Sequence, residues 1–276
     1  MCRWLAYSGS PILLDDLLYK PSHSLIDQSR HAQLGKETTN GDGFGVAWYG
    51  EDRSAAVIRV VGPAWANRNL RELATHVRSP LFLAHVRSST GTPVQETNCH
   101  PFRHDRWLWM HNGMIADFPR VKRDLVLAVD PALYASIEGS TDSEVMFYLA
   151  LTFGLLDDPP GAVERMAGLV EAIGHGYGIA YPLQMTVAAS DGERLWAFRY
   201  SSEHRSRSLF YSSHVHTLHE THPDNDNLRQ LSYHSRLVVS EPLGDLAGGW
   251  IEVPESSVSL IHDGRDEIRP FRPQPA

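Results

Sequence analysis

The order of strand-like and helix-like segments is the strongest constraint on the fold of this chain. Short runs rich in Val, Ile, Phe and Trp, separated by Gly, Pro and polar residues, predict strands in the first half. These runs occupy residues 44–50, 55–62, 81–89 and 106–113. A helix is predicted at residues 67–77, and two longer ones at 142–156 and 161–174, where apolar residues recur at helical spacing.

Strand signals return after this helical pair. They lie at residues 184–190, 194–201, 208–213, 236–243 and 250–255. Asp191-Gly192 predicts a hairpin between the first two, and Ser140 or Thr141 can cap the helix that begins at Asp142. Because strands and helices do not alternate regularly, we predict a layered α+β domain over residues 2–260, followed by a polar, proline-rich tail over residues 261–276.

Charge and composition indicate which kinds of partner and which cellular compartment can be expected for this chain. The formal net charge is −8, so an extended basic surface for nucleic acid is not expected. No apolar run is long enough to span a bilayer, and the N-terminus lacks the pattern of a secretory signal, so we expect a cytoplasmic protein. Cys2 and Cys99 are the two cysteines, which argues against a disulfide scaffold.

Cys2 directly follows the initiator methionine, and this position has chemical consequences. Removal of Met1 would give Cys2 a thiol and a free α-amino group on the same residue. An α-amino group has an ordinary pKa of about 7.7 to 8, so it can act as a base near neutral pH. Attack of the thiolate on an amide or ester carbonyl also requires donors that stabilise the resulting oxyanion.

Several short motifs could complete such a site, although each also has a purely structural interpretation. Asn112 and Gly113 follow an apolar strand and could donate to an oxyanion, yet Asn-Gly is also a favoured hairpin turn. Arg87, with Thr90, could bind a carboxylate, or it could be a solvated surface arginine. Asp142 could bind an ammonium group, or it could simply favour a helix N-terminus.

Taken in order, these motifs resemble a known family. The chain contains MCRWLAYSG at its start, then NGDGFGVAW, AHVRSSTGT, NCHPF, HNGMI and STDSEV. Over at least residues 2–150 this series is similar to the class II glutamine amidotransferases, which use an N-terminal nucleophile. The chain looks most like the free-standing bacterial branch of that family.

The resemblance implies a fold and a set of roles. The fold is the four-layer αββα sandwich of N-terminal nucleophile hydrolases. Cys2 is implied as the nucleophile, and Asn112 with the N–H of Gly113 as the oxyanion hole. The resemblance implies that Arg87 binds the α-carboxylate of the substrate and that Asp142 binds its α-ammonium group. It also implies that Thr90 and His111 lie near the bound substrate.

The chain also departs from the family pattern. Ser88 and Gly91 stand where several members have Trp and His. We expect no acceptor domain after the strands that follow the helical pair. We therefore predict a stand-alone amidohydrolase that cleaves the γ-glutamyl amide of glutamine or another γ-glutamyl compound through a Cys2 thioester. One alternative is an N-terminal nucleophile acylase for another amide. The other is a non-catalytic γ-glutamyl-binding or ammonia-supplying subunit of a larger complex, in which the partner would be a separate synthase or peptidase. The oligomeric state stays open.

The remaining candidate motifs do not predict a cofactor. His214 to His222 contains closely spaced imidazoles, but we interpret it, like His100 and His104, as an exposed loop rather than a metal site. NGDGFG lacks the spacing of a dinucleotide fingerprint, so we expect a tight loop in which Asp42 can orient the site. Cys99 is expected to be a packing residue. We predict no metal and no cofactor.

Overall fold

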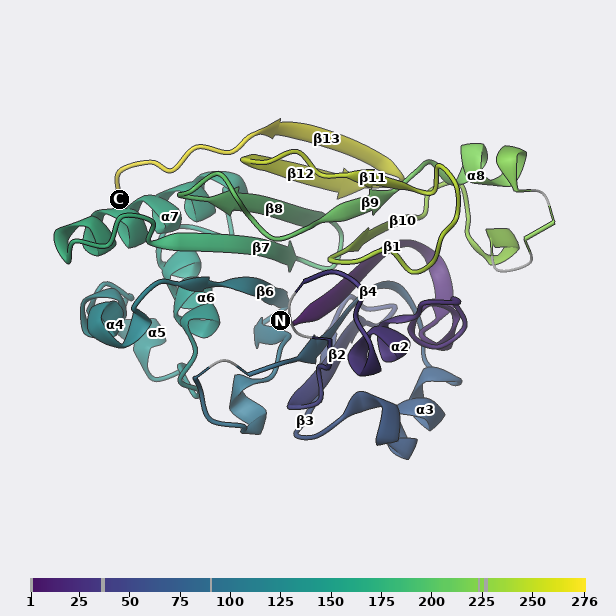
Figure 1. The fold of residues 1–276 in the computed structure, drawn as a ribbon, viewed down its shortest axis with the longest axis horizontal. Helices are drawn as coiled ribbons and strands as arrows, with labels where there is room; N and C mark the ends of the chain where they lie inside the picture. Colours follow the sequence, from purple (N-terminus) through teal and green to yellow (C-terminus); the bar gives the residue numbers. More distant parts are fainter. Residues whose placement is uncertain (1, 36–37, 90, 223, 226–227) are drawn as a thin grey trace.

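The computed structural model describes residues 2–35, 38–89, 91–222, 224–225 and 228–276, and it contains two antiparallel sheets (Figure 1). The first sheet has the strand order β11-β9-β10-β1-β4-β2-β3. In chain order these strands are β1 (Arg3–Leu13), β2 (Gly43–Tyr49), β3 (Ala55–Val60), β4 (Arg78–Arg87), β9 (Phe210–Ser212), β10 (Arg236–Val239) and β11 (Trp250–Glu252). Its centre, formed by β1 and β4, therefore comes from the first third of the chain.

The second sheet has the order β13-β12-β8-β7-β6-β5. Its strands are β5 (Phe102–His104), β6 (Trp107–Ile115), β7 (Leu183–Ser190), β8 (Leu195–Ser201), β12 (Ser257–His262) and β13 (Arg265–Pro270). The expected hairpin at Asp191-Gly192 joins β7 to β8. Gly192 has a φ of 91°, a conformation that glycine adopts without strain.

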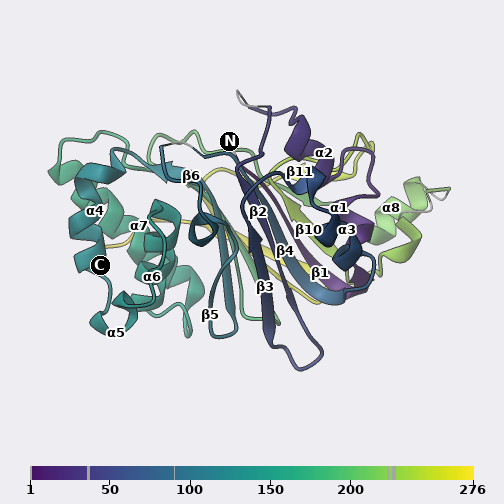
Figure 2. The same cartoon turned by 90° about the horizontal axis from the view of Figure 1, so that it is seen from below.

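Helices cover the outer face of each sheet, which gives four layers (Figures 1 and 2). The second sheet is covered by α4 (Phe118–Leu127), α5 (Pro131–Tyr134), α6 (Asp142–Thr152) and α7 (Pro159–Gly176). On the first sheet lie α1 (Asp15–Leu18), α2 (Leu25–Arg30), α3 (Arg68–Ala74) and α8 (Val215–Thr221). Single 3-10 turns occur at Ala64–Ala66, Glu96–Asn98 and Leu228–Gln230. The architecture is the αββα sandwich.

Alternation along the strands builds a core between the two sheets and one under each helix layer. On β1, Leu5 and Tyr7 pack toward the helices, whereas Trp4 and Ala6 pack between the sheets. The same alternation divides the side chains of β4 and β6. Since successive strand residues point to opposite faces, each of these strands contributes to two cores at once.

Most of the predicted elements are present. Strands occur within all nine predicted segments, and Thr141 caps α6 by accepting a hydrogen bond from the N–H of Glu144 at 3.2 Å. Asn112-Gly113 does not form a turn, because β6 continues through it to Ile115 and pairs with β7. Pairing with a neighbouring strand has overridden the local turn preference of that dipeptide.

The C-terminal segment also differs from its prediction. The sequence predicts a tail from residue 261, but β13 pairs with β12 over Arg265–Pro270 and Phe271 is buried. β13 is an edge strand, and its mostly exposed polar side chains are typical of edges protected against further pairing. Among the residues described, no helix has the length and apolar character needed to cross a bilayer.

Candidate active site

The geometry of the strands brings three of the predicted residues to the space between the sheets. On β4, Arg87 shares the face of Leu81 and Leu83, which pack between the sheets. β1 pairs with β4 so that Arg3 is opposite Val86, and one further step along β1 places Cys2 beside Arg87. Asn112 reaches the same space from β6 of the other sheet, where its side-chain nitrogen lies 3.1 Å from the carbonyl oxygen of Cys2.

Cys2 is half-buried and directly precedes β1. Its thiol donates to the carbonyl oxygen of Ser88 at 3.6 Å. Burial raises the pKa of the Cys2 thiol, and the nearby guanidinium groups of Arg87 and Arg3 only partly oppose this shift. The thiol is therefore protonated at neutral pH and needs a base before it can act as a nucleophile.

Gly113 follows Asn112 on β6, and the structure explains why this position is a glycine. A Cβ atom built on Gly113 would lie 2.0 Å from the carbonyl oxygen of Gln184 on β7 and 2.5 Å from Nε2 of His111. Its φ of 157° is a further constraint. The close approach of β6 and β7 beside Asn112 thus depends on the absence of a side chain.

Arg87 is a buried cation that contacts only neutral acceptors among the residues described. Its Nη2 donates to Oγ of Ser89 at 3.1 Å, Oγ1 of Thr92 at 2.7 Å and the carbonyl oxygen of Pro93 at 3.2 Å. Its Nη1 is buried and has no hydrogen-bond partner in that part of the chain. A buried guanidinium nitrogen without a partner is costly, so this atom is suited to bind an anion.

Asp142 begins α6, and its carboxylate is fixed by main-chain donors. Oδ2 accepts from the N–H of Ile115 at 2.8 Å, and Oδ1 accepts from the N–H of Ser143 at 2.7 Å. These contacts tie the end of β6 to the start of α6. The carboxylate is thereby held at the wall of the cavity that also contains Cys2.

His111 contacts the same turn of α6 from inside β6. Its Nδ1 lies 2.7 Å from Oγ of Ser143, and its Nε2 lies 3.4 Å from the carbonyl oxygen of Gln184. Because a carbonyl can only accept, Nε2 carries the proton and Nδ1 accepts from Ser143. Burial lowers the pKa of His111, although the Asp142 carboxylate opposes that shift, so the imidazole is neutral.

One cavity of about 350 Å³ joins these residues. Its lining includes Cys2, Arg87, His111, Asn112, Gly113 and Asp142. Of the predicted site residues, Thr90 lies outside the described residues. The volume is in the range of small-molecule pockets, and the wall carries a thiol, a cation and an anion. The arrangement can bind a small zwitterion beside a nucleophile.

Three further residues of the site were not predicted. Thr92 accepts from Arg87, and Ser143 connects Asp142 to His111, because its main-chain N–H donates to Asp142 and its hydroxyl donates to His111. His100, interpreted from the sequence as part of an exposed loop, instead lines the cavity and is 4% exposed. All three lie inside motifs that the sequence presents, namely STGT, STDSEV and NCHPF, so position within these motifs was the available signal.

Comparison with known proteins shows the family of this chain. The family model described as glutamine amidotransferases class-II matches residues 20–271, which is most of the chain. The chain belongs to the class II glutamine amidotransferases. Its fold and the order of its motifs are those that the resemblance implies.

Similar proteins of this family cover nearly the whole chain. The probable glutamine amidotransferase DUG3 of Saccharomyces cerevisiae is 34% identical, over 95% of this chain and 82% of that one. Gamma-glutamyl-hercynylcysteine sulfoxide hydrolase of Mycolicibacterium smegmatis is 26% identical, over 98% of this chain and all of that one. The solved glutamine aminotransferase class-II domain protein from Silicibacter pomeroyi has a TM-score of 0.75 and 34% identity, and the match covers 99% of this chain and 100% of that one.

The histidine-rich segment of this amidotransferase forms a helix rather than the predicted loop. His216 lies 3.4 Å from Glu220, and Nε2 of His219 and of His222 contact the carbonyl oxygens of Leu228 and Ala247 at 2.8 and 2.9 Å. In the part of the chain that the structure describes, no group of three His, Cys, Asp or Glu side chains could hold a metal ion. These imidazoles stabilise local structure.

Two other predicted roles in the amidotransferase can be compared with the structure. Asp42 accepts from the N–H of Ser89 at 2.7 Å, so it orients the loop that carries the partners of Arg87. Cys99 is fully buried, and its thiol lies 3.7 Å from the carbonyl oxygen of Val60, as expected of a packing residue. His104 lies on β5 and is half-buried.

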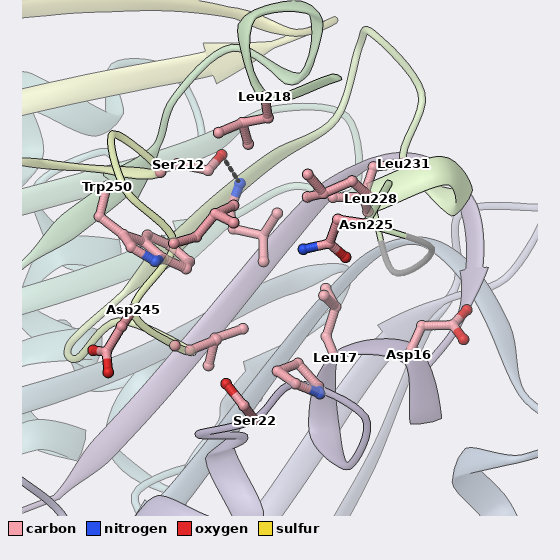
Figure 3. Close-up of a pocket in the computed structure, with 16 residues that line it drawn as sticks. Asp16, Leu17, Ser22, Ser212, Leu218, Asn225, Leu228, Leu231, Asp245 and Trp250 are labelled. Carbon is pink, nitrogen blue, oxygen red and sulfur yellow. Dashed lines mark hydrogen bonds between the residues drawn. The ribbon is translucent and has the colours of Figure 1, made fainter. Parts of the chain in front are cut away.

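A second cavity of about 380 Å³ lies between α1, α8 and the loop after β10 (Figure 3). Its wall is largely aliphatic and is formed by Leu17, Leu218, Leu228, Leu231, Leu237, Leu243 and Leu246, with Trp250 at one side. Amide cleavage needs a nucleophile and oxyanion donors. The residues predicted for these roles line the cavity at Cys2, and no described site residue predicted from the sequence lines the leucine-lined cavity. The cavity at Cys2 is therefore the candidate active site of the amidotransferase.

Proposed function

We propose that this amidotransferase hydrolyses the γ-glutamyl amide bond of glutamine or of another γ-glutamyl compound, with Cys2 as the N-terminal nucleophile. One observation carries the proposal. Cys2, Asn112, Arg87 and Asp142 come from four different elements, yet they line a single cavity of about 350 Å³. Burial keeps the Cys2 thiol protonated, so the α-amino group exposed by removal of Met1 is the base that the reaction needs.

In the first step the α-amino group of Cys2 takes the thiol proton, and the sulfur attacks the γ-carbonyl carbon. The oxyanion that forms is stabilised by the side-chain amide of Asn112 and the N–H of Gly113. Collapse of this intermediate breaks the C–N bond, and the departing amine receives the proton. Water then attacks the γ-glutamyl thioester, which yields free glutamate and restores the thiol.

Two charges define how the substrate is oriented. Arg87 binds the α-carboxylate, since its buried Nη1 has no partner in the described part of the chain. Asp142 binds the α-ammonium with a carboxylate that main-chain donors already hold in place. A cation and an anion at fixed positions allow only one orientation of a zwitterion, and that orientation directs the side-chain amide toward Cys2.

The names of the relatives support γ-glutamyl compounds as the substrate class. One relative is named gamma-glutamyl-hercynylcysteine sulfoxide hydrolase and another probable glutamine amidotransferase. The released amine or ammonia either leaves the protein or passes to a separate synthase or peptidase. Both cysteines are free thiols, which fits a reducing compartment, so we place the protein in the cytoplasm.

Mass spectrometry tests this proposal most directly. We expect the mature protein to begin at Cys2 and, when it is mixed with glutamine or a γ-glutamyl peptide and quenched with acid, to carry a γ-glutamyl group on that residue. Cys2→Ala should fold, bind substrate and release no glutamate. Retention of Met1 in an active enzyme, or activity that survives Cys2→Ala, would contradict the mechanism. Cellular function that survives Cys2→Ala would favour a non-catalytic subunit.

A further inference from the structure

Arg3 connects the nucleophile to a carboxylate from the far end of the chain. Its Nη1 donates to the carbonyl oxygen of Cys2 at 3.0 Å, and its Nε donates to Oε2 of Glu241 at 2.7 Å. The two side chains are 3% and 2% exposed. A buried ion pair therefore lies directly behind the main chain of Cys2.

Glu241 is itself held by several donors. Oε1 lies 2.6 Å from Nε2 of His23 and accepts from the N–H of Gln33 at 2.8 Å, and Oε2 accepts from the N–H of Leu34 at 2.9 Å. Burial alone would raise the pKa of Glu241, but these hydrogen bonds and that of Arg3 together outweigh burial and lower it. The carboxylate is therefore ionised and fixed.

The main chain around Glu241 is fixed as well. Nε2 of Gln28, from α2, donates to the carbonyl oxygens of Glu241 and Pro242 at 3.2 and 3.1 Å. The N–H of His23 donates to the carbonyl oxygen of Leu243, which lies in the wall of the leucine-lined cavity. The loop after β10 thus presents Glu241 to Arg3 from a rigid base.

We propose that Glu241, acting through Arg3, is a positioning residue for Cys2. The inference rests on the proposed function, in which Cys2 becomes the first residue of the chain. A first residue has no preceding peptide bond, and terminal residues are poorly ordered unless they are held. The carbonyl group of Cys2 is held by two donors, Nη1 of Arg3 and Nδ2 of Asn112.

The chemistry of the pair explains why an arginine and a glutamate are needed. Arg3 must reach Cys2 and Glu241 at the same time with two different nitrogens of one planar group, which the single ammonium of a lysine cannot do. A buried guanidinium without an anion would be costly, and Glu241 supplies that anion. Arg87 meanwhile keeps its charge for the carboxylate of the substrate.

The variant Glu241→Gln tests the proposal, with Glu164→Gln as its matched control. Glu164 on α7 is also a buried glutamate, and it accepts from Nη1 of Arg269 at 2.9 Å and Nε2 of Gln274 at 3.0 Å in the outer helix layer. Both variants lose one buried charge, so a general loss of stability should be similar in the two. Unfolding by urea establishes that each is folded under the assay conditions.

We expect kcat for γ-glutamyl hydrolysis to fall about tenfold to a hundredfold in Glu241→Gln, because small misplacements of a reacting group cost about that much. KM should stay within about twofold, since Arg87 and Asp142 are unchanged. Glu164→Gln should change kcat by less than about twofold. Arg3→Lys should have a lower kcat than the wild type, even when mass spectrometry shows that Met1 has been removed from the variant. An equal kcat in the two glutamate variants, or a fall in kcat matched by a rise in KM, would overturn the proposal.

A second measurement does not depend on activity. Added aminopeptidase removes an N-terminal residue faster when that residue is loosely held, and mass spectrometry follows the loss of Cys2. We expect this loss to be about tenfold faster in Glu241→Gln than in Glu164→Gln, and equal rates would overturn the positioning role. If the wild-type protein forms no acyl-enzyme, the proposed function fails, whereas the trimming rates still decide whether Glu241 holds Cys2.

Discussion

The side-chain amide of Asn112 donates a hydrogen bond to the carbonyl oxygen of Cys2 across 3.1 Å. This contact joins β6 of one sheet to the start of β1 in the other. An amide nitrogen carries two hydrogens, so one can hold Cys2 while the second serves the oxyanion. The same side chain therefore has two roles in the proposed reaction.

Removal of this amide should have a large effect on the chemical step. We expect Asn112→Ala to lower kcat about a hundredfold to a thousandfold, the usual effect of losing one oxyanion donor. Asn67→Ala is the matched control, because Asn67 caps α3 and accepts from the N–H of Leu70 at 2.8 Å. Steady-state kinetics with glutamine measure both variants. A fall in kcat of less than about tenfold in Asn112→Ala would contradict its oxyanion role.

Arg87 should act mainly in substrate binding. Arg87→Lys keeps the positive charge but loses the planar group that can donate two parallel hydrogen bonds to a carboxylate. We expect KM for glutamine to rise about tenfold to a hundredfold while kcat changes much less. Arg103→Lys, at an exposed arginine that donates to the carbonyl oxygen of Ala55, is the control. An unchanged KM in Arg87→Lys would exclude Arg87 as the carboxylate site.

Asp142 can be tested with a substrate analogue. Glutaramate has the side-chain amide and the carboxylate of glutamine but lacks its α-amino group. The wild-type enzyme should prefer glutamine, and Asp142→Asn should reduce that preference about tenfold or more, because the ion pair is lost. Asp158→Asn, which alters the cap of α7, should leave the preference unchanged. Equal turnover of both substrates by the wild type would favour another N-terminal nucleophile acylase.

The sequence was most informative where local pattern and tertiary structure agree. Apolar runs in residues 81–89 and 106–113 predict strands. Because side chains alternate between the two faces of a strand, Arg87 and Asn112 point to the space between the sheets. The cap at Thr141 is a local signal, and it sets where α6 begins and hence where Asp142 lies. These parts of the site follow from spacing along the chain.

Other parts depend on contacts that no local pattern carries. Arg3 and Glu241 are 238 residues apart, and neither stands in a sequence that indicates the other. Asn112-Gly113 has the composition of a turn, yet pairing with β7 keeps it extended. The polar residues of β13 resemble a tail because an edge strand exposes most of its side chains. In each case the deciding interaction comes from a distant segment.

His85 predicts how stability depends on pH. It is 1% exposed on β4, and its ring centroid lies 4.3 Å from that of His100. Burial, followed by the charge of Arg87, lowers the pKa of His85 to about 3. An unfolded histidine has a pKa of about 6.5, so below that pH the unfolded chain binds a proton that the folded protein does not. His85 therefore contributes stability above about pH 6.5, which is lost progressively as the pH falls toward 3.

His85→Phe should remove this dependence while keeping a ring in the same space. Between about pH 6 and pH 4, the free energy of unfolding of the wild type should fall more steeply than that of the variant, by up to about 1.4 kcal/mol per pH unit. Urea unfolding at several pH values measures both slopes. His76→Phe, at an exposed imidazole, controls for the exchange of histidine for phenylalanine. If the free energy of unfolding falls equally with pH in the wild type and in His85→Phe, His85 binds a proton equally in the folded and unfolded states. That result would contradict the lowered pKa of His85.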